Sequence, residues 1–190
     1  SQETFRHAVA ATAVRPGLDG TPYLYTLNLS CPEVRARARQ LIEGDVVPAI
    51  DRALEESRLS PRLLCVEITE TALMDNPHQA AHVLSELRTL GARIYLDDFG
   101  TGYSSLNHLH KLPVDALKID QSFVRGLAQS PQDQAIVTTV INLARSLGLH
   151  TVAEGVETHR DLEVVLRLGA DAVQRHAMAV LTRVLEPEHE

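Results

Sequence analysis

The stretch RIYLDDFGTGYSSLNHLHKLPVDALKID, residues 93–120, contains two short apolar runs that each end in charged side chains. The first run ends in the adjacent acids Asp97 and Asp98, and the second ends in Lys118 and Asp120. Short apolar runs bounded by turn residues are typical of strands that are buried on both faces, as in a parallel sheet. The stretch therefore predicts two buried strands with ionisable groups at their carboxyl ends.

The same alternation of short and long patterns extends outward on both sides. With the two runs above, the predicted strands cover residues 23–30, 63–69, 93–99, 116–120, 150–156 and 171–174. Longer amphipathic patterns between them predict helices over 33–58, 78–90, 133–147 and 159–168. Gly91, Gly148 and Gly169 each follow a helical pattern and suit a left-handed helix end. Strand and helix in regular alternation predict an α/β fold with a parallel sheet, in one domain over residues 1–190.

Each predicted strand ends in a polar group that can bind a metal or a ligand. These groups are Asn28, Glu67, Asp97 with Asp98, Lys118 with Asp120, Glu154 and Gln174. In a (β/α) barrel the carboxyl ends of all strands face the active site, whereas an open doubly wound sheet binds ligands only near a switch point. Polar ends on every strand therefore favour a TIM-like (β/α) barrel of about six parallel strands over the open sheet.

The composition limits the function classes. A formal net charge of −7, the absence of Trp and only three Phe argue against a long nucleic acid as partner. No stretch approaches the ~20 apolar residues of a membrane span, and the first residues lack the apolar segment of a signal peptide. Cys31 and Cys65 have no metal-ligand spacing, so neither a disulfide framework nor a zinc site is predicted. We expect a cytoplasmic protein with no membrane segment in this chain.

The polar ends of the strands supply oxygen ligands, which suit Mg²⁺ or Mn²⁺ better than Zn²⁺. Several carboxylates side by side also need a cation to compensate their charge. Because side-chain alternation ends with the strand, Asp97 and Asp98 could both turn toward one cluster and bridge two ions that clamp a phosphodiester. Lys118 would add a positive charge beside that cluster. Gly100 and Gly102, directly after the acidic pair, predict an active-site loop that comes close to a ligand.

Five longer strings follow one another in a fixed order and spacing: NLS (28–30), EITET (67–71), DDFGTGYSSL (97–106), LPVDALKIDQSFV (112–124) and AEGVET (153–158). Together they resemble the EAL family of cyclic di-GMP phosphodiesterases, with a resemblance that extends over residues 3–174. The resemblance implies a modified TIM barrel with one antiparallel strand. It also implies a role in bacterial second-messenger signalling, through metal-dependent hydrolysis of cyclic di-GMP to the linear dinucleotide pGpG.

The resemblance implies a two-metal site with Mg²⁺ or Mn²⁺, whose ligands are matched by Asn28, Glu67, Asp97, Asp98 and Glu154. The first three resemble ligands of the first metal and the last two resemble ligands of the second, with Asp97 bridging both. Lys118 resembles the lysine that contacts the catalytic water. Glu154 is also similar to a residue viewed as the general base, so its two roles are hard to separate.

Other matched positions have supporting roles in the family, namely Glu70, Gly100, Gly102 and Glu157. Of these, Glu70 resembles the residue that anchors the Asp-Asp loop. Substrate contacts are predicted for Asp120 and Gln174. The resemblance further implies cyclic di-GMP as partner, a homodimer contact through the Asp-Asp loop region, and an attached GGDEF or sensory domain in a longer protein.

The sequence departs from the family at both ends. No Glu-Ala-Leu tripeptide occurs in the 190 residues, and ETFRHAVAATA (3–13) resembles the helix that follows that motif. We therefore expect a domain truncated at its N-terminus relative to the family, with the first metal one ligand short. After Gln174, Arg175 stands in place of a glycine, where a bulky side chain opposes the close approach of a ligand.

Missing strands would leave unpaired sheet edges, which natural proteins normally cover. Three explanations stay open: a fragment of a longer gene product, a gap filled by a partner chain, or a fold relaxed into an open sheet. The leading functional hypothesis is a cyclic di-GMP phosphodiesterase whose turnover is weak or lost. The alternative is a catalytically inactive domain that acts as a cyclic di-GMP receptor or a protein-interaction module. A metal-dependent barrel enzyme of unrelated chemistry would need different loop strings.

Overall fold

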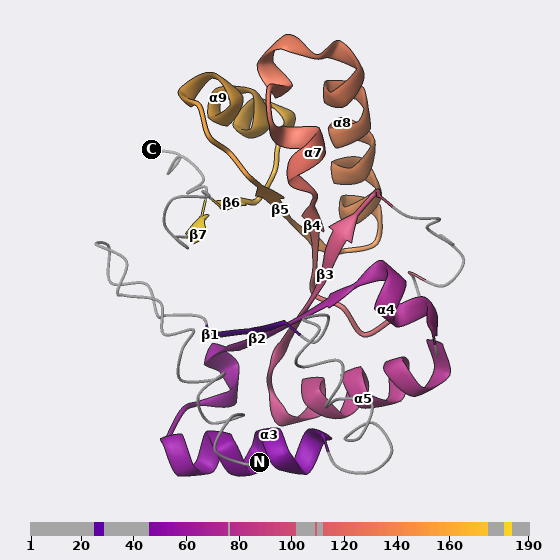
Figure 1. Ribbon diagram of the computed structural model, residues 1–190, viewed down its shortest axis with the longest axis vertical. Helices are drawn as coiled ribbons and strands as arrows, with labels where there is room; N and C mark the ends of the chain where they lie inside the picture. Colours follow the sequence, from indigo (N-terminus) through magenta and orange to yellow (C-terminus); the bar gives the residue numbers. More distant parts are fainter. Residues whose placement is uncertain are drawn as a thin grey trace. The chain divides into compact units, whose positions relative to one another are not determined.

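The computed structural model describes residues 25–28, 46–75, 77–101, 109, 112–174 and 181–183 (Figure 1). The chain divides into two compact units. The first takes in residues up to Leu96 and the segment from Ser105 to Asp115, and the second takes in Asp97–Ser104 and the chain from Ala116 onward. The division falls within one strand, so each unit is described in turn.

In the first unit, β1 (Tyr25–Asn28) pairs in parallel with β2 (Leu64–Thr69), and β2 neighbours β3 (Arg93–Phe99). Three helices accompany these strands: α3 (Val46–Ser57), α4 (Glu70–Asp75) and α5 (Pro77–Leu90). A 3₁₀ turn, η1 (Pro61–Leu63), leads into β2. The register of the first pair sets Asn28, the last residue of β1, opposite Glu67, two residues before the end of β2.

Apolar spacing explains these helices. The buried residues of α3 are Val46, Ile50, Ala53 and Leu54, a spacing of three and four that lies on one helical face. Helix α5 buries Leu84 and Leu87 and contacts α3 within the unit (Figure 1). Strand β2 is buried along nearly all of its length, as expected for a parallel strand covered on both faces.

In the second unit the strand order is β3, β4 (Ala116–Ile119), β5 (His150–Glu154), β6 (Ala172–Gln174) and β7 (Leu181–Arg183). Strands β4, β5 and β6 pair in parallel, and β7 is antiparallel to β6. The helices are α7 (Gln121–Val124), α8 (Pro131–Ser146) and α9 (His159–Leu168), with a 3₁₀ turn η2 (Leu127–Gln129) between α7 and α8. Helix α8, the longest helix that the structure describes in this unit, contacts α7, α9, β4 and β5 (Figure 1).

Side-chain caps fix where the longer helices of this unit begin. The Ser130 hydroxyl accepts a hydrogen bond from the Asp133 N–H at the start of α8, and Thr158 does the same for Asp161 at the start of α9. Gly169 ends α9 in the left-handed conformation, which a residue without Cβ adopts at no steric cost.

The α/β class and the six parallel strands are confirmed, with strand bounds close to those predicted. The left-handed conformations at Gly91, Gly148 and Gly169 are confirmed as well. Of the helix predicted over 33–58, the part that the structure describes is α3; residues 33–45 lie outside the described residues, as do Gly102 and Arg175.

The sequence did not predict α4, α7 or β7, because segments of three to six residues carry too little periodicity to be recognised. None of the helices that the structure describes combines the length and the apolar character needed to cross a lipid bilayer.

Candidate active site

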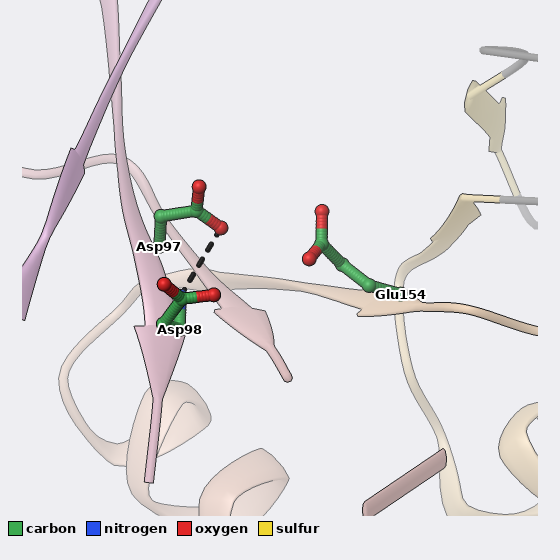
Figure 2. A group of neighbouring side chains, drawn as sticks. All are labelled: Asp97, Asp98 and Glu154. Atoms are coloured by element: carbon green, nitrogen blue, oxygen red, sulfur yellow. Dashed lines mark hydrogen bonds between the residues drawn. The ribbon is translucent and has the colours of Figure 1, made fainter. Parts of the chain in front are cut away.

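Three carboxylates of the second unit converge at the ends of two strands. Asp97 and Asp98 lie at the end of β3 and Glu154 lies at the end of β5, and each offers an oxygen within 4.8 Å of the others. Figure 2 shows the Glu154 side chain pointing toward the two aspartates. Parallel strands bring their carboxyl ends to the same edge of a sheet, which is why residues far apart in the sequence meet here.

Lys118 lies between these carboxylates. It is only 2% exposed, and its Nζ lies 2.9 Å from Asp97 Oδ1 and 2.6 Å from Glu154 Oε1. Its strand, β4, lies between β3 and β5 in the sheet, so one ammonium group reaches an acid on each neighbouring strand. A buried ammonium group requires such partners, because isolated charges are strongly disfavoured away from water.

The backbone at the end of β3 turns both aspartates toward the cluster. Consecutive side chains on a strand normally point to opposite faces, but Asp98 has a positive φ of 55°. Its N–H donates a hydrogen bond of 3.1 Å to Asp97 Oδ1, drawn as the dashed line in Figure 2. Thr101 closes the turn by donating from its N–H and its hydroxyl to the Asp98 carbonyl. Aspartate is among the few residues that adopt this conformation, and such strain is concentrated at functional sites.

The cluster contains three carboxylates and one ammonium group, and the pKa values of two of the acids are raised. Burial raises the pKa of Asp98, and the charges of Asp97 and Asp120 raise it further. Burial also raises the pKa of Glu154, against the opposing effect of Lys118, while Asp97 and Asp98 add to the rise. Three carboxylates thus lie around one ammonium group, and the raised pKa values of Asp98 and Glu154 mean that the ionised forms of these two acids are disfavoured.

This donor set fits a divalent cation. Carboxylate oxygens are the ligands that hard cations such as Mg²⁺, Mn²⁺ and Ca²⁺ prefer, and the group contains no thiolate or imidazole that would favour a softer metal. A cation would also supply the charge that Lys118 alone does not. The burial of Asp97, together with the raised pKa values of Asp98 and Glu154, distinguishes the cluster from an ordinary acidic surface patch.

Three predicted site residues belong to the first unit. Asn28 and Glu67 are partners in the β1–β2 register, and Glu67 is 8% exposed. Glu70, the first residue of α4, is 5% exposed, and neither of its carboxylate oxygens has a hydrogen-bond partner among the residues that the structure describes.

The remaining predicted residues lie close to the cluster or to its loops. Asp120 caps α7 by accepting a hydrogen bond of 2.9 Å from the Ser122 N–H, which is the ordinary role of an acid at a strand end. Gln174 lies opposite Glu154 in the β5–β6 register. Glu157 forms an ion pair of 3.0 Å with Arg125, and both side chains are about half exposed. Gly100 has a φ of +100° directly after the acidic turn.

Sequence reasoning missed a buried acid that supports one of these loops. Asp161 is 3% exposed and accepts hydrogen bonds of 2.9 Å from the Ala128 N–H and 2.6 Å from the Thr158 hydroxyl. It thereby joins the start of α9, just after the loop that follows Glu154, to η2. The pattern Thr158-x-x-Asp161 is that of a helix capping box and could have predicted its position, although not its link to Ala128.

Comparison with known proteins identifies the family. The family model described as EAL domain matches residues 22–174. The cyclic di-GMP phosphodiesterase NbdA of Pseudomonas aeruginosa is 42% identical over 141 residues, which is 74% of this chain and 18% of NbdA. The cyclic di-GMP phosphodiesterase PdeR of Escherichia coli is 40% identical over 128 residues, 67% of this chain and 19% of PdeR. This chain therefore spans only about a fifth of the length of these curated relatives.

Solved structures agree with the family match. A complex of the PaMucR phosphodiesterase with c-di-GMP superimposes with a TM-score of 0.77 and 34% identity, covering 96% of this chain and 76% of that one. A manganese and cy-diGMP complex of Klebsiella pneumoniae BlrP1 gives a TM-score of 0.68 and 27% identity, covering 95% of this chain and 44% of that one. The calcium and cy-diGMP complex of BlrP1 gives a TM-score of 0.73 and 29% identity, covering 92% of this chain and 42% of that one.

Proposed function

This chain belongs to the EAL domain family, and from that premise we propose that it carries a metal-dependent phosphodiesterase site for cyclic di-GMP. The product is the linear dinucleotide pGpG. The single observation that carries the proposal is the cluster of Asp97, Asp98 and Glu154 around the buried Lys118. Named relatives that hydrolyse cyclic di-GMP, and structures of relatives in complex with it, support the choice of substrate.

The three carboxylates are proposed to hold divalent cations, with Asn28 and Glu67 as further ligands. Bound cations of this kind supply Lewis-acid activation of water and of the phosphodiester. Metal complexes of a relative contain manganese or calcium, which supports a divalent cation here, and the oxygen donors lead us to propose Mg²⁺ or Mn²⁺ as the native one.

Lys118 and Glu154 are proposed as the catalytic pair. The oxygen of a water molecule adds to phosphorus, the bond from phosphorus to the bridging 3′ oxygen breaks, and one proton of that water ends on the leaving oxygen. Glu154, whose pKa is raised, is suited to accept the proton of the attacking water. Lys118 keeps the Asp97 and Glu154 carboxylates in place through contacts of 2.9 and 2.6 Å, and its positive charge favours the negative charge that develops on the phosphate oxygens.

Further parts of the proposal concern the surroundings of the site. Asp120 and Gln174 contact the nucleotide. Glu70, Gly100 and Gly102 support the Asp-Asp loop. The region of that loop also takes part in a homodimer. We place the protein in the cytoplasm, within a longer chain that carries a GGDEF or sensory domain. The bifunctional diguanylate cyclase/cyclic di-GMP phosphodiesterase MucR of P. aeruginosa, of which 21% matches this chain, supports such a combination.

The test is chromatographic detection of pGpG from cyclic di-GMP with Mn²⁺ present, using the full-length protein. We expect hydrolysis by the unaltered protein and a loss of about 100-fold or more in kcat with Glu154→Gln, since proton transfer by a positioned carboxylate contributes at least that much. Ile141→Val, a change in the buried face of α8, is the matched control and should retain activity. Equal rates for Glu154→Gln and the unaltered protein would contradict the assignment.

One sequence feature favours a second function, that of a receptor. Arg175 stands where the family has a glycine after Gln174, and a bulky side chain there opposes close approach of the ligand for catalysis. Folded full-length protein that binds cyclic di-GMP without forming pGpG would support the receptor and contradict the enzyme.

A further inference from the structure

The short helix α7 contacts the loops that follow both acid-bearing strands. A single residue, the helix cap Asp120, separates it from β4, and the helix is only one turn long. Its two contact residues, Gln121 and Phe123, face different glycines. One glycine lies in the loop after β3 and the other in the loop after β5.

The loop after β3 packs against the ring of Phe123. Gly100 has a φ of +100°, and a Cβ built on it would lie 3.2 Å from Phe123 Cε2. Such a distance is tighter than ordinary van der Waals contact, so the backbone of the loop already rests against the ring edge. Gly100 is two residues beyond Asp98, and the Asp98 carbonyl is held by Thr101. The ring therefore limits where the acidic turn can move.

The loop after β5 packs even more tightly against Gln121. Gly155 has a φ of +67°, and a Cβ built on it would lie 2.5 Å from Gln121 Cβ and 3.3 Å from Gln121 Cα. Gly155 directly follows Glu154, so the peptide that carries this carboxylate lies against the first turn of α7. The ion pair of Arg125 with Glu157 adds a second link between the end of α7 and the same loop.

From these contacts we propose that α7 is a positioning element, with Phe123 and Gln121 as positioning residues that fix the Asp98 and Glu154 carboxylates relative to each other. Helix α7 itself also contacts α8 and β5. The inference rests on the proposed function in that the two carboxylates serve as ligands of a divalent cation. Residues that orient metal ligands from outside typically change metal affinity by about 10-fold to 100-fold when they are replaced.

The first test measures the affinity of the full-length chain for Mn²⁺ alone, without nucleotide, by titration calorimetry. We expect Phe123→Ala to weaken Mn²⁺ binding by about 10-fold or more, and Phe123→Leu, which keeps an apolar side chain against Gly100, to weaken it less. Ile141→Ala is the matched control, because it removes a buried side chain of α8 that lies outside α7 and both loops.

Thermal unfolding without metal shows how far each variant is destabilised. Phe123→Ala and Ile141→Ala should both lower Tm, but only Phe123→Ala should lower Mn²⁺ affinity. Equal Mn²⁺ affinities for Phe123→Ala and Ile141→Ala would overturn the inference for Phe123.

The second test uses the close approach of Gly155 to Gln121. Gly155→Ala should weaken Mn²⁺ binding, because the new methyl group overlaps Gln121 Cβ and displaces the Glu154 loop. Gln121→Gly removes the overlapping atom, so the double variant should bind Mn²⁺ more tightly than Gly155→Ala alone. Additive losses in the double variant would show that the two residues are not coupled and would overturn the inference for Gln121.

The outcomes for this inference and for the proposed function are separate. An unaltered protein that binds Mn²⁺ but forms no pGpG would contradict the phosphodiesterase while the affinity measurements still decide the role of α7. An unaltered protein that does not bind Mn²⁺ would overturn the positioning inference itself.

Discussion

Asp98 combines a positive φ with a raised pKa, so its presence disfavours the folded state in two ways. At the scale of single residues, this is the pattern of a side chain kept for binding rather than for stability. Lys118 is the opposite case, because its two short ion pairs hold together carboxylates that would otherwise repel each other. The two residues therefore give predictions of opposite sign.

We predict that Asp98→Asn raises the Tm of the metal-free protein at neutral pH. Because the pKa of Asp98 in the folded chain lies above its ordinary value of 3.8, stability is lost as the pH rises through the folded pKa. Asparagine has no proton to lose, so it stays uncharged as the pH rises, and it adopts a positive φ readily. Thermal unfolding in EDTA should show the gain at pH 7 and its disappearance below pH 3.8. A lower Tm for the variant at neutral pH would contradict the charge imbalance.

We predict that Lys118→Met destabilises the metal-free protein by about 3 kcal/mol, because it leaves buried carboxylates without their partner. Chemical denaturation at neutral pH measures the change. Since the remaining groups are acids, the loss should shrink at low pH, where they bind protons. Arg145→Met, which removes an exposed cation of α8, is the control and should change stability little. Equal stabilities of the two variants would show that Lys118 is not a structural partner.

At the scale of elements, an aspartate side chain accepts hydrogen bonds near the amino end of each of two strands. Asp115, just before β4, accepts a hydrogen bond of 2.8 Å from the Ile94 N–H near the start of β3. Asp171, just before β6, accepts from the Thr151 N–H and hydroxyl near the start of β5, at 2.7 and 2.8 Å. In both cases an acid just before one strand binds the start of the preceding strand: β3 in the case of Asp115 and β5 in the case of Asp171. Strands β3 and β5 are also the two that carry the acidic cluster.

We predict that Asp171→Ala costs about 2 kcal/mol, since Thr151 is buried and loses its partner for two donors. Asp171→Asn retains an acceptor oxygen and should cost less. Urea denaturation of both variants measures the difference, with Asp133→Ala in the first turn of α8, where the side chain is partly exposed, as a control for loss of an acidic side chain. Similar values for Asp171→Ala and Asp133→Ala would contradict a role in holding β5.

At the scale of the whole molecule, folding and cation binding are linked. A cation that binds only the folded chain stabilises it, by about 1.4 kcal/mol at ten times its dissociation constant. The linkage should act through the cluster, because its carboxylates approach one another only in the folded chain.

We therefore predict that Mn²⁺ raises the Tm of the full-length protein and that EDTA reverses the increase. Asp97→Asn should abolish the shift, because Asp97 belongs to the three-acid cluster and pairs with Lys118. The comparison uses the shift caused by Mn²⁺ and not the absolute Tm, since the substitution also weakens the ion pair. An unchanged Mn²⁺ shift in Asp97→Asn would remove the cluster from consideration.

Much of this molecule could be predicted from local patterns. The long helices and the buried strands follow from apolar spacing, and the oxygen donors follow from the polar residues at strand ends. The acidic pair and its loop glycine can be predicted because they lie together within residues 97–100. The one-turn helix α7 was missed, because four residues are too few to establish a helical period.

The sequence by itself determined the longer helices, the strands of the parallel sheet and the chemical class of the site, because hydrophobic periodicity and donor type are properties of short segments. Only the tertiary structure decided that Lys118 lies between Asp97 and Glu154, that Asp98 turns inward with a positive φ, and that α7 lies against both acidic loops. These features depend on distances between residues on different strands and helices. Such distances are set by how the elements pack, which no local pattern encodes.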